Sequence, residues 1–321
     1  MKDLYQKAIA KEFYEERYKD GYMDEWPMEK KIKVIDVIKS LSLPKMGKGL
    51  DFGCGNGVFT NVLKQALPEW EIYGSDISEV AVKNAEERYP DCKFFVSDNE
   101  QFSELEFDFL FSHHVLEHVF DIQKTISEIN VYLKTEAKML HILPCGNENS
   151  FEFNVCKLRT DGINKDMEDR FFFEDEGHVR RLTTARANDL MEAHNFKLEK
   201  GFYNNQYYNA LRWITRSPDF IMNFTDPTKA INSKSLKRLK SLRYKLILLR
   251  YLQLPALLFL QVRKVYNKTL KHYLILAIDF VPYLVSYPFY SYIETKAEAE
   301  WDESKEQENG SEMYLYYERK Q

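Results

Sequence analysis

The sequence has few cysteines and none in a paired motif. Cys54, Cys92, Cys145 and Cys156 are scattered along the chain, and no two of them form a CxxC pair. Structural zinc sites and dithiol redox motifs need closely spaced cysteines, so we expect neither, and we expect no metal site. Isolated cysteines are typical of a reducing compartment, which predicts a cytoplasmic protein.

Long apolar runs are also missing. Residues 1–20 are highly charged and contain no apolar segment of the kind that signal peptides have. No stretch reaches the roughly 18 consecutive apolar residues that a bilayer-spanning helix needs. The densest run, from Leu246 to Val262, is interrupted by Arg250 and Pro255. We therefore expect no secretion signal and no membrane-spanning segment.

The chain lacks an excess of positive charge. Its 45 Lys and Arg residues are outnumbered by 50 Asp and Glu residues, which gives a net charge of -5. This balance argues against a general nucleic-acid binder. With 44% apolar residues, the 321-residue chain can bury a sizeable core, as one large domain or as one domain with an addition.

Short apolar strands alternate with helical segments in the first two thirds of the sequence. Strands are predicted at 49–52, 71–75, 93–97, 107–112, 138–143 and 196–203, a last strand at 313–317, and helices at 58–67, 79–89, 121–133 and 182–195. This alternation predicts a Rossmann-like α/β fold. We expect a mostly parallel seven-stranded sheet with helices on both faces, and a helical insertion before the last strand. Such sheets bind ligands beyond the carboxyl ends of their strands.

The same pattern divides the chain into four parts. We predict an N-terminal helical lid (1–45), an α/β core (46–205), a helical insertion rich in basic and aromatic residues (206–300), and an acidic loop with the final strand (301–321).

A glycine-rich loop follows the first predicted strand. In Asp51-Phe52-Gly53-Cys54-Gly55-Asn56-Gly57, alternate glycines allow a tight turn and a close backbone approach to a ligand. The loop leads into a helix whose first amides face a polar group. Dinucleotide enzymes favour GxGxxG, which receives a pyrophosphate. Here the pattern is GxGxG, and the preceding carboxylate of Asp51 suits a cationic amino-acid ligand better than a diphosphate.

Acidic residues follow the next two strands. Asp76 ends the second strand, where a carboxylate accepts hydrogen bonds from ribose hydroxyls. Asp98 ends the third strand, near the place for an exocyclic base amine. With Asp51, these carboxylates would converge on one cleft. The alternative is that Asp76 and Asp98 cap the helices that follow them.

These motifs together resemble one family. LDFGCGNGVFT, GSDIS, VSDNEQF and FDFLFSHHVLEHV are similar to successive motifs of the class I S-adenosylmethionine-dependent methyltransferases, and GHVRRLTTARANDLMEAHNF is similar to their segment before the sixth strand. The resemblance covers about residues 25–205 and the final strand. It implies an enzyme that uses S-adenosyl-L-methionine.

The resemblance also implies roles for individual residues. The methionine portion would be held by Asp51, Gly53, Cys54, Gly55 and Gly57. Asp76 would bind the ribose, Ile77 would flank the adenine, and Asp98 and Asn99 would read its edge. Ser112 and His113 would line the cleft, and Tyr18 and Tyr22 would form a lid.

Transfer of an activated methyl group to a hydroxyl needs positioning and a base. Histidine has a suitable pKa, and the candidates are His113, His118 and His178. The alternative for His118 and His178 is that they hold loops in place. His114 is interpreted as structural. Arg180 and Arg181 either bind an anionic acceptor or are solvated charges.

The insertion is basic and amphipathic. Twelve Lys or Arg residues and no acidic residue lie between Pro227 and Ile278, and leucines recur at helical spacing from Leu236 to Leu249. A basic amphipathic helix can bind anionic membrane surfaces, so one interpretation is that residues 229–290 make peripheral contact at the inner face of the membrane, or hold a lipid-linked acceptor. The alternative is that the stripe packs on the core or in a homodimer.

The sequence thus predicts O-methylation of a saccharide or of a lipid-linked intermediate of surface-glycan assembly, with a small-molecule acceptor and N-methylation left open. Nucleic acid is not expected as a partner. The alternatives are an NAD-dependent oxidoreductase and a non-catalytic, cofactor-binding or membrane-docked scaffold.

Overall fold

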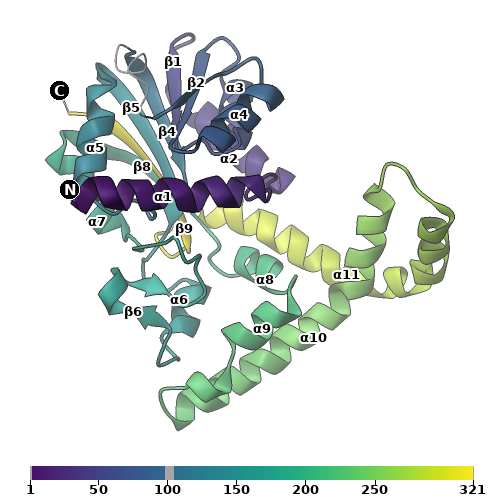
Figure 1. Cartoon of the computed structure of the whole chain (residues 1–321). Helices are drawn as coiled ribbons and strands as arrows, with labels where there is room; N and C mark the ends of the chain where they lie inside the picture. The colour runs from purple at the N-terminus through teal and green to yellow at the C-terminus, as the bar shows by residue number, and fades with distance from the viewer. Residues whose placement is uncertain (1, 98–104, 321) are drawn as a thin grey trace. The chain divides into compact units, whose positions relative to one another are not determined.

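The computed structural model describes residues 2–97 and 105–320 (Figure 1). Asp98 and Asn99, the two predicted adenine contacts, lie outside the described residues. The chain divides into two compact units. Unit 1 comprises Met1–Pro144, Thr184–Gly201 and Tyr314–Gln321, and unit 2 comprises Cys145–Thr183 and Phe202–Met313.

The main sheet has seven strands in the order β3-β2-β1-β4-β5-β9-β8. Their bounds are β1 Lys48–Phe52, β2 Glu71–Asp76, β3 Lys93–Val96, β4 Phe107–His113, β5 Leu133–Pro144, β8 Phe196–Asn204 and β9 Glu312–Arg319. The pairings of β1 with β2 and β4, of β2 with β3, and of β4 with β5 are parallel. The parallel strands β1 to β5 bring their carboxyl ends to the same edge of the sheet. The seven-stranded, mostly parallel sheet confirms the predicted fold class.

Six helices are described in unit 1. They are α1 Lys2–Lys19, α2 Met28–Ser40, α3 Val58–Ala66, α4 Glu79–Arg88, α5 Ile122–Val131 and α7 Thr184–Ala193. Most predicted bounds agree within a few residues. The exception is β5, which begins at Leu133, where a helix was predicted to end, and reaches Pro144, because Leu133 already pairs with Phe107 of β4.

Unit 2 is mostly helical, as predicted for the insertion. Its elements are α6 Phe151–Cys156, β6 Ile163–Asn164, η2 Lys165–Met167, β7 Arg170–Phe171, α8 Tyr208–Ile214, α9 Pro218–Phe224, η3 Pro227–Lys229, α10 Ser233–Lys264 and α11 Leu270–Ser304. The long helix α11 continues through Pro282 and Pro288 into the acidic stretch, past the predicted boundary at residue 300.

The leucine stripe of α10 packs inside unit 2. Leu239 and Leu246 are fully buried in a cluster with Ile214 of α8 and with Ile221 and Phe224 of α9. The proximal half of α10 therefore uses its apolar face to form the core of unit 2, and this face is not available to a membrane.

Two arginines of α10 complete the same packing. Arg250 Nη1 donates to the carbonyls of Thr215 and Arg216 at 2.8 and 2.6 Å, at the end of α8. Arg243 donates to the Met222 carbonyl and to the Thr225 hydroxyl, at the end of α9. Cations are favourable at helix C-termini because the last carbonyls lack intrahelical partners. These two charges are structural.

Candidate functional site

The glycine loop between β1 and α3 has the backbone of a ligand cradle. Gly55 and Gly57 have φ angles of 50° and 78°, in the left-handed region that favours glycine. A Cβ atom at Gly55 would lie 2.7 Å from the Tyr18 hydroxyl, so a larger residue here would crowd the space in front of the loop. The sequence therefore leaves room for close approach of another group to the backbone.

Asp51 lies beneath this loop. Its side chain is only 1% exposed, and its Oδ2 accepts a hydrogen bond of 2.7 Å from the Thr60 hydroxyl of α3. Burial, with a smaller effect of the charge of Asp76, raises the pKa of Asp51 to about 7 against the opposing effect of the Thr60 hydrogen bond. Thr60 was not identified from the sequence, although its position one turn into the helix after the loop is a usable signal.

Asp76 joins the loop to the next helix. Its Oδ2 accepts from the Gly55 amide at 2.9 Å and its Oδ1 accepts from the Ser78 amide at 2.9 Å. The N-cap of α4 is Ser78, whose hydroxyl accepts from Ala81 N. Burial raises the pKa of Asp76 in spite of these backbone hydrogen bonds. Asp76 thus faces the glycine loop as well as the start of α4.

The two carboxyl groups fit a cationic ligand. Within the described part of the chain, no cationic side chain is among the main groups that set the pKa of Asp51 or Asp76. Buried carboxylates are costly unless a positive group or hydrogen bonds compensate them. A ligand that carries an ammonium and a sulfonium supplies that charge. The two carboxyl groups at the loop therefore suit S-adenosyl-L-methionine.

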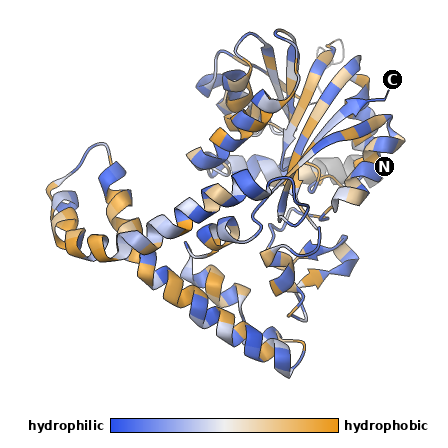
Figure 2. Ribbon diagram, turned by 180° about the vertical axis from the view of Figure 1, so that it is seen from behind, coloured by the Kyte–Doolittle hydropathy of each residue, from blue (hydrophilic) through white to orange (hydrophobic). Residues whose placement is uncertain are grey.

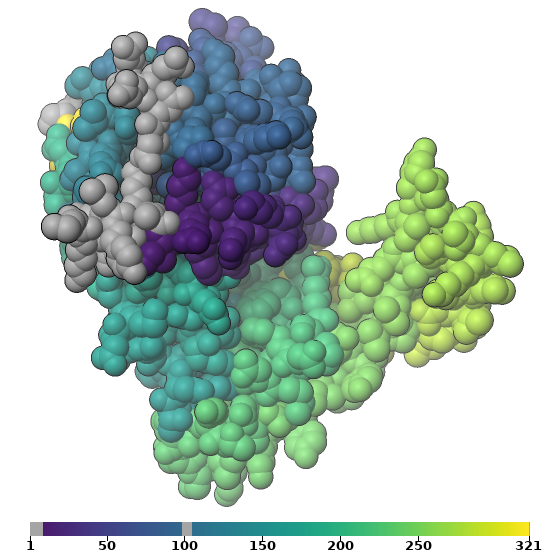
Figure 3. Space-filling model, in the orientation of Figure 1, coloured from purple at the N-terminus to yellow at the C-terminus, as the bar shows by residue number. Residues whose placement is uncertain are grey.

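Helix α1 covers the loop. Tyr18 is buried, with its hydroxyl directly over Gly55. Burial and the charge of Asp76 hold the Tyr18 pKa well above its usual value, so its hydroxyl is neutral. Figure 3 shows α1, in dark purple, lying against the blue surface that includes α4. Tyr18, one of the two predicted lid tyrosines, lies against the glycine loop, and the lid role of Tyr18 and Tyr22 remains a prediction.

Glu15 fastens α1 to the start of α4. Its carboxylate accepts hydrogen bonds from the amides of Glu79 and Val80, at 2.7 and 3.2 Å, and from the Ser78 hydroxyl at 3.1 Å. On the same helix, Lys11 pairs with Glu79 at 2.6 Å. Asn56 of the loop donates to the Tyr22 carbonyl at 3.1 Å. These contacts were not predicted, because nothing in the sequence places α1 on α4.

Ser112 and His113 end β4. The Ser112 hydroxyl hydrogen-bonds to His141 Nδ1 on β5 at 2.7 Å. Burial lowers the pKa of His141 to about 4, so that ring is neutral at pH 7. The His113 ring stacks on Phe59 at 3.8 Å and meets Trp26 edge-on at 4.8 Å. The roles predicted for Ser112 and His113 in the cleft remain predictions.

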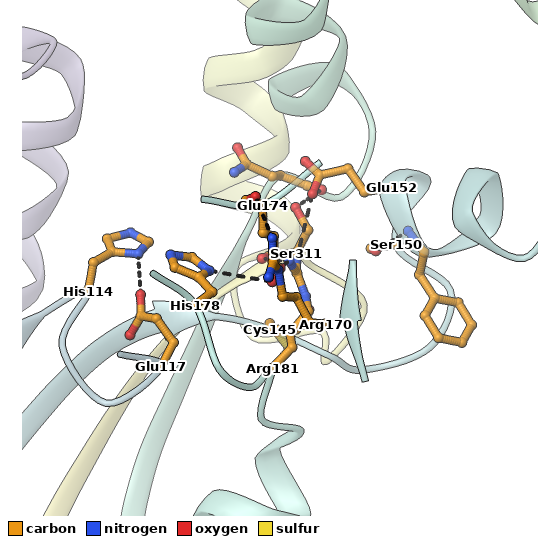
Figure 4. A network of polar contacts seen from close by, with 12 residues as sticks. His114, Glu117, Cys145, Ser150, Glu152, Arg170, Glu174, His178, Arg181 and Ser311 are labelled. Atoms are coloured by element: carbon orange, nitrogen blue, oxygen red, sulfur yellow. Dashed lines mark hydrogen bonds and ion pairs between the residues drawn. The ribbon is translucent and has the colours of Figure 1, made fainter. Parts of the chain in front are cut away.

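The turn after β4 carries two more histidines, His114 and His118. His118 Nδ1 hydrogen-bonds to the Tyr14 hydroxyl of α1 at 2.8 Å. His114 has a φ of 55° and hydrogen-bonds through Nδ1 to Glu117 at 2.8 Å (Figure 4). His114 thus helps to shape the turn, whereas His118 connects the turn to the helix that covers the glycine loop.

The segment GHVRRLT lies in unit 2 and supplies a buried ion-pair network (Figure 4). Arg181 pairs with Glu174 and donates to the carbonyls of Cys145 and Ser311, both at 2.8 Å. His178 Nδ1 lies 3.4 Å from the other oxygen of Glu174. Arg180 is also buried and pairs with Glu168. The expectation that these arginines are solvated charges is wrong, because folding places both in ion pairs.

A separate hollow lies at the opposite edge of the sheet. It has a volume of about 860 Å³ and is lined by residues at the amino ends of β4 and β5, including Asp108, Lys134 and Lys138. Asp108 and Lys134 already pair at 2.8 Å. This hollow contains none of the predicted site residues, and parallel sheets bind their ligands at the other edge.

Comparison with known proteins identifies the family. A family model described as a methyltransferase domain matches residues 25–200, more than half of the chain, so the chain belongs to this family. This segment is an S-adenosylmethionine-dependent methyltransferase domain, which confirms the resemblance, the enzyme class and the cofactor predicted from the sequence. It argues against an NAD-dependent oxidoreductase.

Individual relatives match shorter segments. Trans-aconitate 2-methyltransferase of Variovorax paradoxus (strain S110) is 33% identical over 63 residues, which are 20% of this chain and 24% of the relative. Thiocyanate methyltransferase 1 of Brassica oleracea is 39% identical over 90 residues, 26% of this chain and 38% of the relative. The matched segments span less than two fifths of these relatives.

Solved structures include similar proteins at low identity. The magnesium protoporphyrin IX methyltransferase of Synechocystis PCC 6803, solved with bound S-adenosylhomocysteine, is 19% identical. The match covers 63% of this chain and 95% of that protein, with a TM-score of 0.45.

Proposed function

We propose that this protein transfers a methyl group from S-adenosyl-L-methionine to a hydroxyl group of a saccharide or of a lipid-linked glycan intermediate. The observation that carries the methyltransferase assignment of the whole chain is the pair of buried carboxyl groups, Asp51 and Asp76, around the left-handed Gly55. A neutral or anionic ligand would leave their charge uncompensated.

Different residues at the glycine loop would bind different parts of the cofactor. Gly55 lets the backbone approach the methionine portion, and Asp51 and Asp76 compensate its positive charge. Gly53 and Gly57 give the loop its left-handed turns, and protein side chains pack against both of them. Asp76 would also accept from the ribose hydroxyls, and the half-buried Ile77 beside it would contact the adenine. Tyr18 on α1 excludes water from this region. When bound, the cofactor supplies a methyl carbon already activated by a positively charged sulfur.

His118 is the proposed base. Its Nδ1 is engaged with the Tyr14 hydroxyl, which orients the ring. In the tautomer that carries its proton on Nδ1, the other ring nitrogen, Nε2, accepts the proton from the acceptor hydroxyl. The acceptor oxygen would then be ready for an in-line attack on the methyl carbon. The cofactor held at the glycine loop would supply a sulfur that leaves with the electron pair of the broken bond. His178 is the weaker candidate, because its partner Glu174 is shared with the buried Arg181.

The acceptor class rests on unit 2. An insertion of this size before the last strand supplies a large surface for an acceptor, and its exposed lysines suit a phosphorylated or lipid-linked one. The relatives named above act on other molecules, so they do not identify the acceptor. We place the reaction at the cytoplasmic face of a membrane, because the lipid-linked intermediates and the basic insertion would meet there.

Two measurements test the proposal. Isothermal titration of the full chain should show micromolar or tighter binding of S-adenosylhomocysteine and no binding of NAD. Incubation with tritiated S-adenosylmethionine and separated membrane and soluble extracts should label a species in the membrane fraction. Label confined to soluble small molecules would contradict the acceptor class. Binding without any labelled product would favour a scaffold.

A further inference from the structure

The hairpin formed by the distal half of α10 and the first half of α11 has an unusual surface. Figure 2 shows hydrophobic residues on both helices at this end of the hairpin. Between residues 270 and 292 of α11, eleven large apolar or aromatic side chains are at least 41% exposed. They are Leu270, Tyr273, Leu274, Ile278, Phe280, Val281, Leu284, Val285, Tyr287, Phe289 and Tyr292. We call this surface the distal apolar face.

The rest of α11 is firmly held within unit 2. Glu300 accepts hydrogen bonds from the amides of Tyr207, Tyr208 and Asn209 at the start of α8. Arg212 pairs with Glu294 at 3.3 Å. The contrast between this anchored end and the exposed distal half indicates that the distal half has a partner outside the chain. In Figure 3 the distal hairpin, in light green, extends beyond α8 and α9.

The hairpin itself is well packed. Phe259 of α10 stacks on Tyr283 of α11 at 4.2 Å. The small residues Ala256 and Ser286 are buried between the helices. The exposed side chains are therefore not needed for the packing between α10 and α11. Their replacement should not unfold the hairpin.

The distribution of the distal apolar face favours lipid over protein. At 100° per residue, the exposed side chains of α11 from Tyr273 to Phe289 cover more than half of the helix circumference. Helices that pack on a protein usually present a narrower stripe. A surface that is apolar over such a wide arc and includes tyrosines is typical of a helix in a membrane interface.

The charges agree with this interpretation. Arg263, Lys264 and Lys271 are exposed at the turn between the helices, and Lys268 lies between them. The only acidic residue from Pro227 to Ile293 is Asp279. Arg243 and Arg250 are occupied at helix ends, and Lys268 donates to the Val265 carbonyl. Arg263, Lys264 and Lys271 are exposed, so their charges can reach phosphate groups. Basic residues beside an apolar surface complement anionic lipid headgroups.

By length and composition alone, α10 and α11 could each cross a bilayer, although the sequence contains no uninterrupted apolar run that predicts a membrane span. A spanning hairpin would have to carry the four cations of its turn through the hydrocarbon, which is costly. A hairpin that lies along the surface keeps them at the phosphate level. We propose that the distal apolar face docks into one leaflet of an anionic bilayer without spanning it.

Flotation of the full chain with vesicles tests this proposal directly, and it needs no methyl transfer. Vesicles of phosphatidylcholine with phosphatidylglycerol should bind the protein at about 0.05 M salt. Pure phosphatidylcholine should bind it at least about tenfold more weakly, and about 0.5 M salt should weaken binding to the anionic vesicles. Absence of binding to both vesicle types would overturn the proposal, whereas the proposed methyltransferase function would stand.

Matched variants locate the contact. Leu274, Val281 and Val285 are 54%, 65% and 69% exposed, so Leu274→Glu, Val281→Glu and Val285→Glu together should leave the fold intact. This triple variant should bind anionic vesicles at least about tenfold more weakly. The control is Val131→Glu on α5, at a valine that is 75% exposed in unit 1, which should bind as the wild type does. Equal binding by the triple variant would overturn the proposal.

Two other arrangements of the distal apolar face, a dimer and a membrane-spanning hairpin, would give different experimental results. If the distal apolar face joins two copies of this chain, light scattering without lipid shows a dimer that the triple variant dissociates, and vesicles bind neither protein. If the hairpin spans the bilayer, the protein resists alkaline carbonate extraction from native membranes. We expect alkaline carbonate to extract the protein, because a hairpin that lies in one leaflet does not span the bilayer. A Tyr273→Trp variant should have its fluorescence quenched by lipids brominated near the headgroup, more than by lipids brominated at the chain ends.

Discussion

The amide of Gly55 donates to Oδ2 of Asp76 at 2.9 Å, which ties the glycine loop to the strand end 21 residues further along the chain. The other carboxylate oxygen holds the start of α4 through Ser78. One side chain therefore sets the distance between the two elements that would hold the methionine and ribose portions of the cofactor.

Replacing this carboxylate should weaken cofactor binding. Asp76→Asn keeps the size of the side chain but removes its charge and one acceptor, so the affinity for S-adenosylhomocysteine should fall by about 10- to 150-fold. Isothermal titration measures the change. Asp91→Asn, at an exposed position before β3, is the control and should bind as the wild type does. An unchanged affinity of Asp76→Asn would remove Asp76 from the site.

The pKa of Asp51 predicts a pH dependence of stability. The group titrates near 3.8 when exposed and at about 7 in the folded protein. Between these values the folded state binds more protons than the unfolded state, so the stabilising contribution is complete below 3.8 and is lost as the pH rises through 7. The loss is of the order of 4 kcal/mol at most.

Urea unfolding of the cofactor-free protein between pH 4 and pH 8 measures this loss. Asp51→Asn cannot titrate, so the difference in free energy of unfolding between wild type and variant should change over this range in the stated direction. A difference that is independent of pH would show that Asp51 is already ionised in the folded protein.

Loss of the proposed base should act on the chemical step. His118→Gln should lower kcat by about 100- to 10,000-fold, while the affinity for S-adenosylhomocysteine changes little. Tyr14→Phe removes the hydrogen bond that orients the ring. It should cause a smaller loss of kcat, of about tenfold. Assays with the labelled donor measure both. A wild-type kcat in His118→Gln would exclude this residue as the base.

Arg181 should matter for stability more than its neighbour. It is 2% exposed and its guanidinium contacts Glu174 and two carbonyls, so Arg181→Met should lower the free energy of unfolding by about 3–5 kcal/mol. Arg180→Met is the matched control, because its partner Glu168 is 42% exposed and remains hydrated. Denaturant unfolding compares the two. Equal losses would contradict the network as the source of stability.

The sequence predicted the elements of the α/β core well where the residues that define an element are close together in the chain. The glycine loop, Asp51 and Asp76 could be located because a buried strand, a turn and a helix follow each other within a few residues. The parallel sheet follows from the alternation of strands and helices, whereas the order of the strands within it was not predicted. Asp98 and Asn99 lie outside the described residues, so their predicted adenine contacts stay predictions.

The unpredicted contacts join distant parts of the chain. Glu15 meets Ser78 across 63 residues, and Arg250 meets Thr215 across 35. Helical spacing indicated that Leu239 and Leu246 share a face, but not that α8 and α9 cover it. For the same reason the count of twelve cations in the insertion overstated the charge available to lipid, since Arg243 and Arg250 are bound to carbonyls.

The hydrogen bonds between the Glu15 carboxylate and the start of α4 have a consequence for the turnover rate. Tyr18 lies over Gly55, so in the proposed function S-adenosylhomocysteine would leave only after the hydrogen bonds between Glu15 and α4 break. Each turnover would then include a conformational step that is separate from methyl transfer. In rapid-mixing experiments the first turnover would outrun all later ones, as happens when exit is slower than chemistry.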